Sequence, residues 1–170
     1  MLSFSHPKLS RRTLLISLAA LSLSACGFTP VLKQGSTARG LQGQIRFNLI
    51  DSRDGFLLLD KLETRLGAPA SSARYAAKVD LMIDESRLTL TAATSVERIT
   101  LNGTAMVSIV DTATDSEVFN GKLRQTTSYT STGETAQTVA SKREAHAKLV
   151  TSLADQIVMR LNSSAESWAK

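Results

Sequence analysis

The chain has 170 residues, of which 42% are hydrophobic, 21% are charged and 5% are aromatic, and its formal net charge is +5. Three basic residues but no acidic residue precede Cys26, so the 145 residues from Cys26 onward hold 17 basic and 15 acidic side chains, a net charge of +2. This balance argues against nucleic acid as a partner, and the length suits a single domain that needs neither disulfides nor metals.

Residues 1–25 have the three zones of a signal peptide. The zones are a basic start with Lys8, Arg11 and Arg12, an apolar stretch over 14–23, and the small residues Ser24 and Ala25. The apolar stretch is too short to span a bilayer, which favours a cleaved signal over a transmembrane helix.

The tetrapeptide Leu23-Ser24-Ala25-Cys26 resembles the bacterial lipobox. The resemblance implies that Cys26 receives a thioether-linked diacylglycerol, becomes the first residue of the mature protein and anchors it through its acyl chains. The chain has no second cysteine, so a disulfide within one copy is excluded. The alternative is an ordinary secretory signal in which this cysteine occurs by chance.

Two further features of this region concern export and sorting. Residues 10–15 (SRRTLL) resemble a twin-arginine signal, but paired arginines also occur in ordinary signals, so both export routes stay open. Gly27 follows the cysteine at the position where an Asp tends to retain lipoproteins in the inner membrane. We therefore expect an outer-membrane lipoprotein that faces the periplasm.

The mature chain begins with an irregular stretch and then predicts a strand and a helix. Residues 26–43 are rich in Gly, Ser, Gln and Thr, which indicates a flexible tether. Residues 44–50 alternate between apolar and polar side chains, as a half-buried strand does. Asp54 is a candidate N-cap for a helix with apolar residues at helical spacing, and Gly67 ends that helix.

Alternation returns in the middle of the chain, and a helix closes it. The predicted strands cover 75–83 with a short extension over 87–91, then 98–110, then 118–129, with a turn at 111–115. A stripe of apolar residues predicts a helix over 139–161, and 163–170 read as a polar, frayed tail. The domain at 44–162 is therefore predicted to be α+β: a mainly antiparallel sheet of about four strands with two helices packed on one face.

Side chains with catalytic chemistry form no recognisable constellation. His146 is expected at the edge of the apolar stripe of the last helix, where a satisfied histidine is commoner than a catalytic base. Asp80, Asp84 and Glu85 come nearest to a carboxylate cluster, but such residues on a polar strand face usually solvate it. Phosphate-loop and zinc patterns are missing from the sequence. We expect a protein that is not an enzyme and has no cofactor or metal; a murein hydrolase is the weaker, catalytic alternative.

Several segments resemble the lipopolysaccharide-assembly lipoprotein family, LptE, in its α-proteobacterial branch. They are Cys26-Gly27-Phe28-Thr29-Pro30, residues 51–67 (DSRDGFLLLDKLETRLG), residues 98–103 (RITLNG) leading into 109–111, and residues 153–157 (LADQI). The similarity extends over essentially the whole mature chain, and it lies in the order and spacing of the segments rather than in one diagnostic motif.

The resemblance implies a non-enzymatic role in lipopolysaccharide transport to the cell surface. Family members partner the outer-membrane β-barrel LptD, sit largely inside its lumen and bind lipopolysaccharide through basic residues near one end of the sheet and helix. The candidates for those contacts in this chain are Arg87, Arg98, Arg124, Lys142 and Arg143. Each of these is, taken alone, more often an ordinary surface charge.

Two alternatives remain open at this stage. The Thr- and Ser-rich strand faces and the segment 128–132 (SYTST) suit the polar lumen of a barrel, but they also suit strands in contact with water. A secretin pilotin or an auxiliary subunit of an ABC lipid transporter would share the lipobox, the small α+β domain and the absence of catalytic groups.

Overall fold

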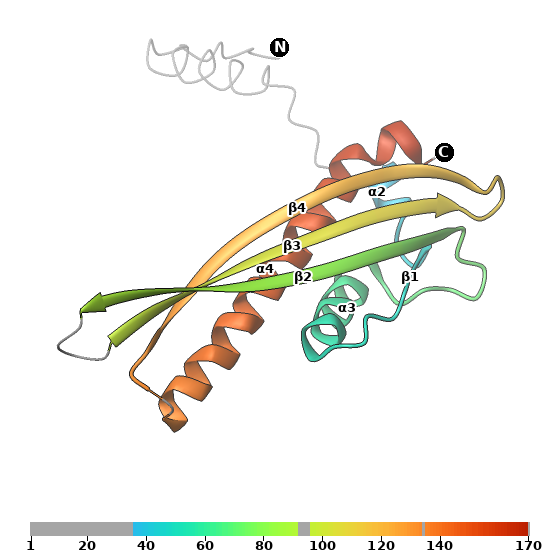
Figure 1. Ribbon diagram of the computed structural model, residues 1–170. Coiled ribbons are helices and arrows are strands. Elements are labelled where there is room, and N and C mark those ends of the chain that lie inside the picture. The colour runs from blue at the N-terminus through green and yellow to red at the C-terminus, as the bar shows by residue number, and fades with distance from the viewer. Residues whose placement is uncertain (1–35, 92–95, 134, 170) are drawn as a thin grey trace, which may run out of the picture.

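The computed structural model describes residues 36–91, 96–133 and 135–169 (Figure 1). Cys26 and the predicted signal peptide lie outside these residues. In chain order, the elements are α2 (Thr37–Gly40), β1 (Ile45–Phe47), α3 (Arg53–Leu66), β2 (Tyr75–Thr91), β3 (Val96–Asp111), β4 (Ser116–Ser131) and α4 (Ala136–Trp168).

The strands form one mixed sheet in the order β1-β2-β3-β4. β1 runs parallel to β2, whereas β2, β3 and β4 are antiparallel neighbours. The two long helices α3 and α4 pack on one face of the sheet, and the described part of the chain leaves the other face uncovered (Figure 1). The predicted α+β class and the four strands are confirmed, and the short helix α2 is added to the two expected helices.

β3 shows how the sequence builds a sheet with one covered face. Leu101, Ala105 and Val107 are at most 1% exposed, while the even-numbered residues between them point to the uncovered side, because side chains alternate along a strand. Gly103 belongs to the covered series, and a Cβ atom there would lie 2.9 Å from Cδ1 of Leu153. The missing side chain therefore lets α4 approach the middle of the sheet closely.

The long strands continue past the limits that alternation predicted. β2 has no break after residue 83, because Glu85 and Arg87 stay in register with Leu101 and Ile99 of β3. β3 and β4 are likewise extended at both ends, and β1 alone is shorter than its predicted range of 44–50. A partner strand supplies hydrogen bonds whatever the side-chain pattern is, so pairing decides where these strands end.

α4 also exceeds its predicted range of 139–161 and ends at Trp168. The described residues of the predicted polar tail, 163–170, form its last turns almost completely. Ala165 is buried there, and the Trp168 ring meets the Tyr75 ring edge-on with 5.3 Å between the centroids. The predicted tail is thus part of the core.

The start of the domain differs from its prediction in a similar way. The described part of the predicted tether at 26–43 includes α2, and both Ala38 and Leu41 are buried in the hydrophobic core. The backbone N–H of Gly43 donates to the carbonyl of Leu66 at 2.7 Å. The folded domain therefore begins before residue 44.

α3 begins at Arg53, and its N-cap is Ser52 rather than Asp54. The Oγ atom of Ser52 accepts a hydrogen bond from the backbone N–H of Gly55 at 2.9 Å, which is a favourable serine cap. Gly67, with φ of +81°, ends the helix as predicted. Because Ser52 serves as the cap, the Asp54 carboxylate is available for a contact with another element.

An ion pair closes the end of the sheet beside α2. Arg74 donates from Nη2 to Oδ2 of Asp111 at 2.7 Å, and the backbone N–H of Ala113 donates to Oδ1 at 2.9 Å. These hydrogen bonds, the one from Arg74 above all, hold the pKa of Asp111 below its usual value. The Asp111 side chain is only 6% exposed, so this carboxylate is enclosed and fully paired.

Candidate functional site

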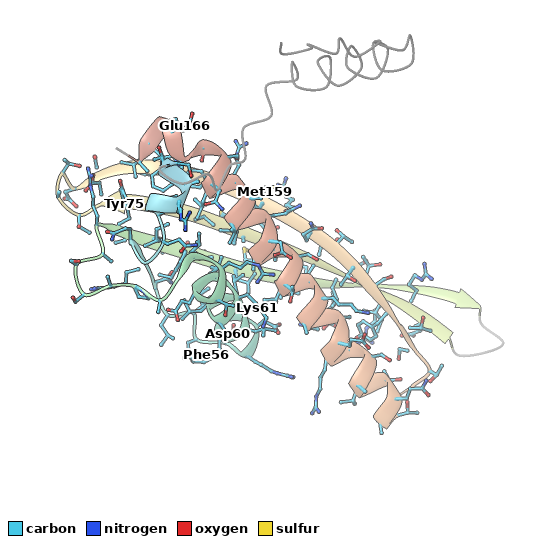
Figure 2. The ribbon with its side chains drawn as sticks, turned by 180° about the vertical axis from the view of Figure 1, so that it is seen from behind. Phe56, Asp60, Lys61, Tyr75, Met159 and Glu166 are labelled. Atoms are coloured by element: carbon cyan, nitrogen blue, oxygen red, sulfur yellow. The ribbon has the colours of Figure 1, made fainter. Side chains whose placement is uncertain are left out.

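The start of α3 and the first half of α4 enclose a basic pocket, which we call the α3–α4 pocket. Its volume is about 310 Å³, and its lining residues are Arg53, Asp54, Val139, Lys142, Arg143 and His146. Figure 2 views the molecule from the helix side, with Phe56 of α3 and Met159 of α4 among the labelled residues. Two of the five predicted lipopolysaccharide contacts, Lys142 and Arg143, lie together in this pocket.

Lys142 is held by a carboxylate of the sheet. Its Nζ lies 2.7 Å from Oε1 of Glu85 on β2. This hydrogen bond raises the pKa of Lys142 and lowers the pKa of Glu85. Lys142 therefore stays protonated but shares its charge with a neighbour, which reduces its attraction for an outside anion.

Arg53 and Arg143 are different, because neither makes an ion pair or a side-chain hydrogen bond among the described residues. Both side chains are exposed. A guanidinium group keeps its charge at any physiological pH and can bind phosphate or carboxylate oxygens in a bidentate manner. These two side chains are therefore the pocket's strongest candidates for an anionic ligand.

His146 joins three elements beside these cations. Its Nδ1 lies 2.6 Å from Oδ2 of Asp54 on α3, and its Nε2 lies 3.4 Å from Oε1 of Glu85 on β2. The ring is half-buried at the edge of the apolar stripe of α4, where the sequence placed it. The contacts explain its position as a bridge between elements, and they also fix the wall of the pocket.

Arg87 lies on β2 two residues beyond Glu85 and on the same face of the sheet, since its register partner is the buried Ile99. Its positive charge acts on the ammonium group of Lys142, where it opposes the stronger effect of Glu85 on the pKa of Lys142. Arg87 thus extends the positive potential of the α3–α4 pocket along the protruding end of the sheet.

Arg98 and Arg124 are on the opposite, uncovered face. Arg98 pairs in register with Thr130, and Arg124 pairs with Thr104. The two arginines are separated by six residues of β4, roughly 20 Å at about 3.3 Å per residue. The five predicted contacts therefore form no single cluster: three border the pocket side and two lie apart on the other face.

The uncovered face is a broad polar surface. It is formed by the even-numbered residues of the long strands, which include Asn102, Thr104, Ser108, Asn120, Lys122, Arg124, Thr126, Ser128 and Thr130. Asp80 and Asp84 also lie on this face, as the alternation predicted. Met82 and Met106, 55% and 40% exposed, interrupt the polar side chains. Such a surface can form many hydrogen bonds with a polar partner.

Sequence reasoning missed Arg53, because the residue lies far from Lys142 and Arg143 in the chain. Its position in the first turn of a helix carries no functional signal. Only the packing of α3 against α4 brings the three cations together. The described residues hold no helix with the length and apolarity to cross a membrane, and no group of His, Cys, Asp and Glu side chains arranged to bind a metal.

No protein-family model and no curated protein sequence matches the chain. Among solved structures, a lipoprotein from Caulobacter crescentus CB15 has a TM-score of 0.62 at 19% identity, over 76% of this chain and 96% of that chain. Lipoprotein B from Nitrosomonas europaea has a TM-score of 0.54 at 15% identity, over 72% and 83% of the two chains. A minor lipoprotein from Acinetobacter baumannii has a TM-score of 0.53 at 14% identity, over 71% and 92%.

These similarities establish a shared fold. The α+β arrangement of this chain recurs in lipoproteins of three bacteria, and it covers most of each of them.

Proposed function

We propose that this protein is an outer-membrane lipoprotein that plugs an LptD-type β-barrel and assists the transport of lipopolysaccharide to the cell surface. The observation that carries the proposal is the uncovered polar face of the sheet. The interior of a large outer-membrane barrel is polar, so a plug needs a wide surface of hydroxyl, amide and charged groups. The lipobox at Cys26 and the fold shared with other lipoproteins support the same role.

The α3–α4 pocket supplies the lipopolysaccharide contact in this proposal. Lipopolysaccharide carries phosphates and carboxylates, and Arg53 and Arg143 offer two guanidinium groups without internal partners among the described residues. Lys142 and Arg87 add positive potential, and Val139 adds apolar surface beside it. The pocket thus combines charge with a small apolar contact, which suits an amphiphilic anion.

Co-purification of the full lipidated chain tests the partner. Mild detergent extraction followed by affinity isolation should recover a large outer-membrane barrel in stoichiometric amount. Recovery of a secretin or an ABC transporter complex in its place would favour the accessory lipoproteins considered above. A Cys26→Ala variant should lose membrane attachment when the partner is absent and keep its fold.

Paired charge reversals test the ligand. Arg53→Glu with Arg143→Glu should weaken lipopolysaccharide binding by about tenfold or more and flatten its salt dependence, because charged hydrogen bonds are lost and screening acts only on charge contacts. The matched control is Arg98→Glu with Arg124→Glu, which changes net charge equally on the other face. Equal losses in both double variants would contradict a pocket-specific contact.

A further inference from the structure

A second hollow lies between β4 and α4, and it points to a different kind of partner. Its volume is about 360 Å³. The lining residues are Thr127, Ser128, Tyr129 and Thr130 near the end of β4, Thr132 just after it, and Gln137, Thr138, Ser141, Glu144, Ala145 and Lys148 of α4. We call it the β4–α4 groove. It shares no lining residue with the α3–α4 pocket.

The lining shows that the groove follows the edge of β4 and not one of its faces. Thr127 to Thr130 are consecutive, and consecutive strand residues point to opposite faces of a sheet. All of them can border the same hollow only where it runs along the strand's side. β4 is the last strand of the sheet, so no described strand pairs with it there.

The hydrogen-bond pattern tells which backbone groups of β4 point into the open. The Tyr75 N–H donates to Gln44 and the Ala77 carbonyl accepts from Asn48, so odd residues of β2 face β1 and even ones face β3. The even residues of β2 are opposite even residues of β3, so these residues of β3 direct their backbone groups toward β2. The odd residues of β3 then direct theirs toward β4, where their register partners are also odd-numbered. The N–H and carbonyl groups of even residues, Ser128 among them, therefore point away from the sheet.

The edge carries no charged residue and no proline where it borders the groove. Natural sheets shield free edges with charged side chains, Lys above all, or with proline. The first part of β4 follows this rule with Glu117, Lys122 and Arg124, whereas residues 125–132 (QTTSYTST) contain no charge and no proline. Threonine and tyrosine favour the strand conformation, so this segment is suited to pair with another strand.

We propose that the β4–α4 groove binds one extended polypeptide segment of a partner protein, which adds to β4 as a fifth strand. In this recognition mode, main-chain hydrogen bonds supply the affinity and the groove walls select side chains. The walls here carry hydroxyl and amide groups, and Glu144 and Lys148 are paired with each other at 2.8 Å. The preferred segment is therefore polar and uncharged.

One other occupant, a second copy of this chain, fits less well. A second copy would offer β4 with its own α4 beside it, which is too bulky for this hollow.

Cross-linking in the native membrane tests the proposal. A photo-cross-linking amino acid replaces Ser141 on the wall of the groove, and adducts are mapped by mass spectrometry. We expect one adduct, confined to one contiguous stretch of one other polypeptide. Ser128→Pro removes an outward N–H and disturbs the strand pairing around it. The loss of that hydrogen bond should reduce the adduct about tenfold or more. Asn120→Pro is the matched control, also outward and exposed but outside the groove, and should leave the adduct unchanged.

Amide hydrogen exchange on the wild-type chain gives a readout that does not depend on how the variants fold. Binding should slow exchange of the Ser128 and Thr130 amides and leave that of Asn120 unchanged. Adducts to lipid, to this chain itself or to no polypeptide, or equal yields in both proline variants, would overturn the proposal. If the mapped stretch belongs to a protein other than a barrel, strand addition is supported and the proposed function is contradicted. If it belongs to a barrel but Ser128→Pro does not reduce the adduct, the proposed function is supported and strand addition is contradicted.

Discussion

Neighbouring residues of β3 face two different environments, and the two faces of the sheet differ accordingly. Val107 is 1% exposed on the face covered by the helices, while Met106 beside it is 40% exposed on the uncovered face. The covered face consists mainly of apolar side chains packed under the long helices, with Glu85 and Arg87 toward the end of β2, and the other face consists mainly of hydroxyl, amide and charged groups. Stability therefore depends on one face, and the other is free to serve recognition.

This division has a physical basis. Apolar burial contributes about 25 cal/mol for each Å² removed from water, and only the covered face removes large areas. Exposed strand residues affect folding mainly through the strand conformation itself, which Thr and Tyr favour. A mutation on the uncovered face should therefore alter binding at little cost in stability, and three experiments test this contrast between the faces.

The largest effect is expected from Leu101→Ala. Leu101 is fully buried, and its loss should lower the free energy of unfolding by about 2–5 kcal/mol through lost transfer energy and a residual cavity. Met106→Ala on the opposite face should cost less than about 0.5 kcal/mol. Urea titration of both variants measures the difference, and similar losses would show that the uncovered face is buried in some way the described residues do not reveal.

A smaller effect is expected from Gly103→Val. The added side chain would meet Leu149 and Leu153 of α4, and such overpacking typically costs about 1–3 kcal/mol. Gly40→Ala is the control, because a Cβ atom there meets nothing within 4 Å. Thermal melts should show a lower transition for Gly103→Val alone. An unchanged transition would mean that α4 can move away from the sheet without loss.

The smallest effect should come from Asp111→Asn, and it should depend on pH. Hydrogen bonds from Arg74 and Ala113 lower the pKa of Asp111 in the folded protein, so the carboxylate stabilises the fold above its unfolded pKa. That contribution is lost as the pH falls through the lowered, folded-state pKa. The wild type should therefore be the more stable protein at neutral pH, and the two should converge in acid. Parallel stability curves from neutral to acidic pH would contradict this role.

The sequence predicted the elements better than their ends. Alternation identified the strands and the apolar stripe identified α4, because both patterns are local consequences of burying one side of an element. The sequence pattern did not predict the final turns of α4, because the polar residues Ser163, Ser164 and Glu166 interrupt its apolar stripe. These turns pack on the core through buried Ala165 and through the Trp168 ring, which contacts Tyr75 at the start of the distant strand β2.

The candidate sites depended still more on tertiary structure. The charges of Lys142 and Arg143 were visible in the sequence, but their grouping with Arg53 and their separation from Arg98 and Arg124 were not. The free edge of β4 was equally hidden, since strand order is a property of the assembled sheet.

Local sequence patterns predicted the α+β class and the residues that alternate between the two faces, and they also predict lipidation at Cys26, because each of these inferences follows from neighbours along the chain. The folded chain was needed to show which cations share a pocket, where α4 ends and which strand lies at the open edge. Those features arise from contacts between segments far apart in sequence, and local patterns carry no information about which distant segments meet.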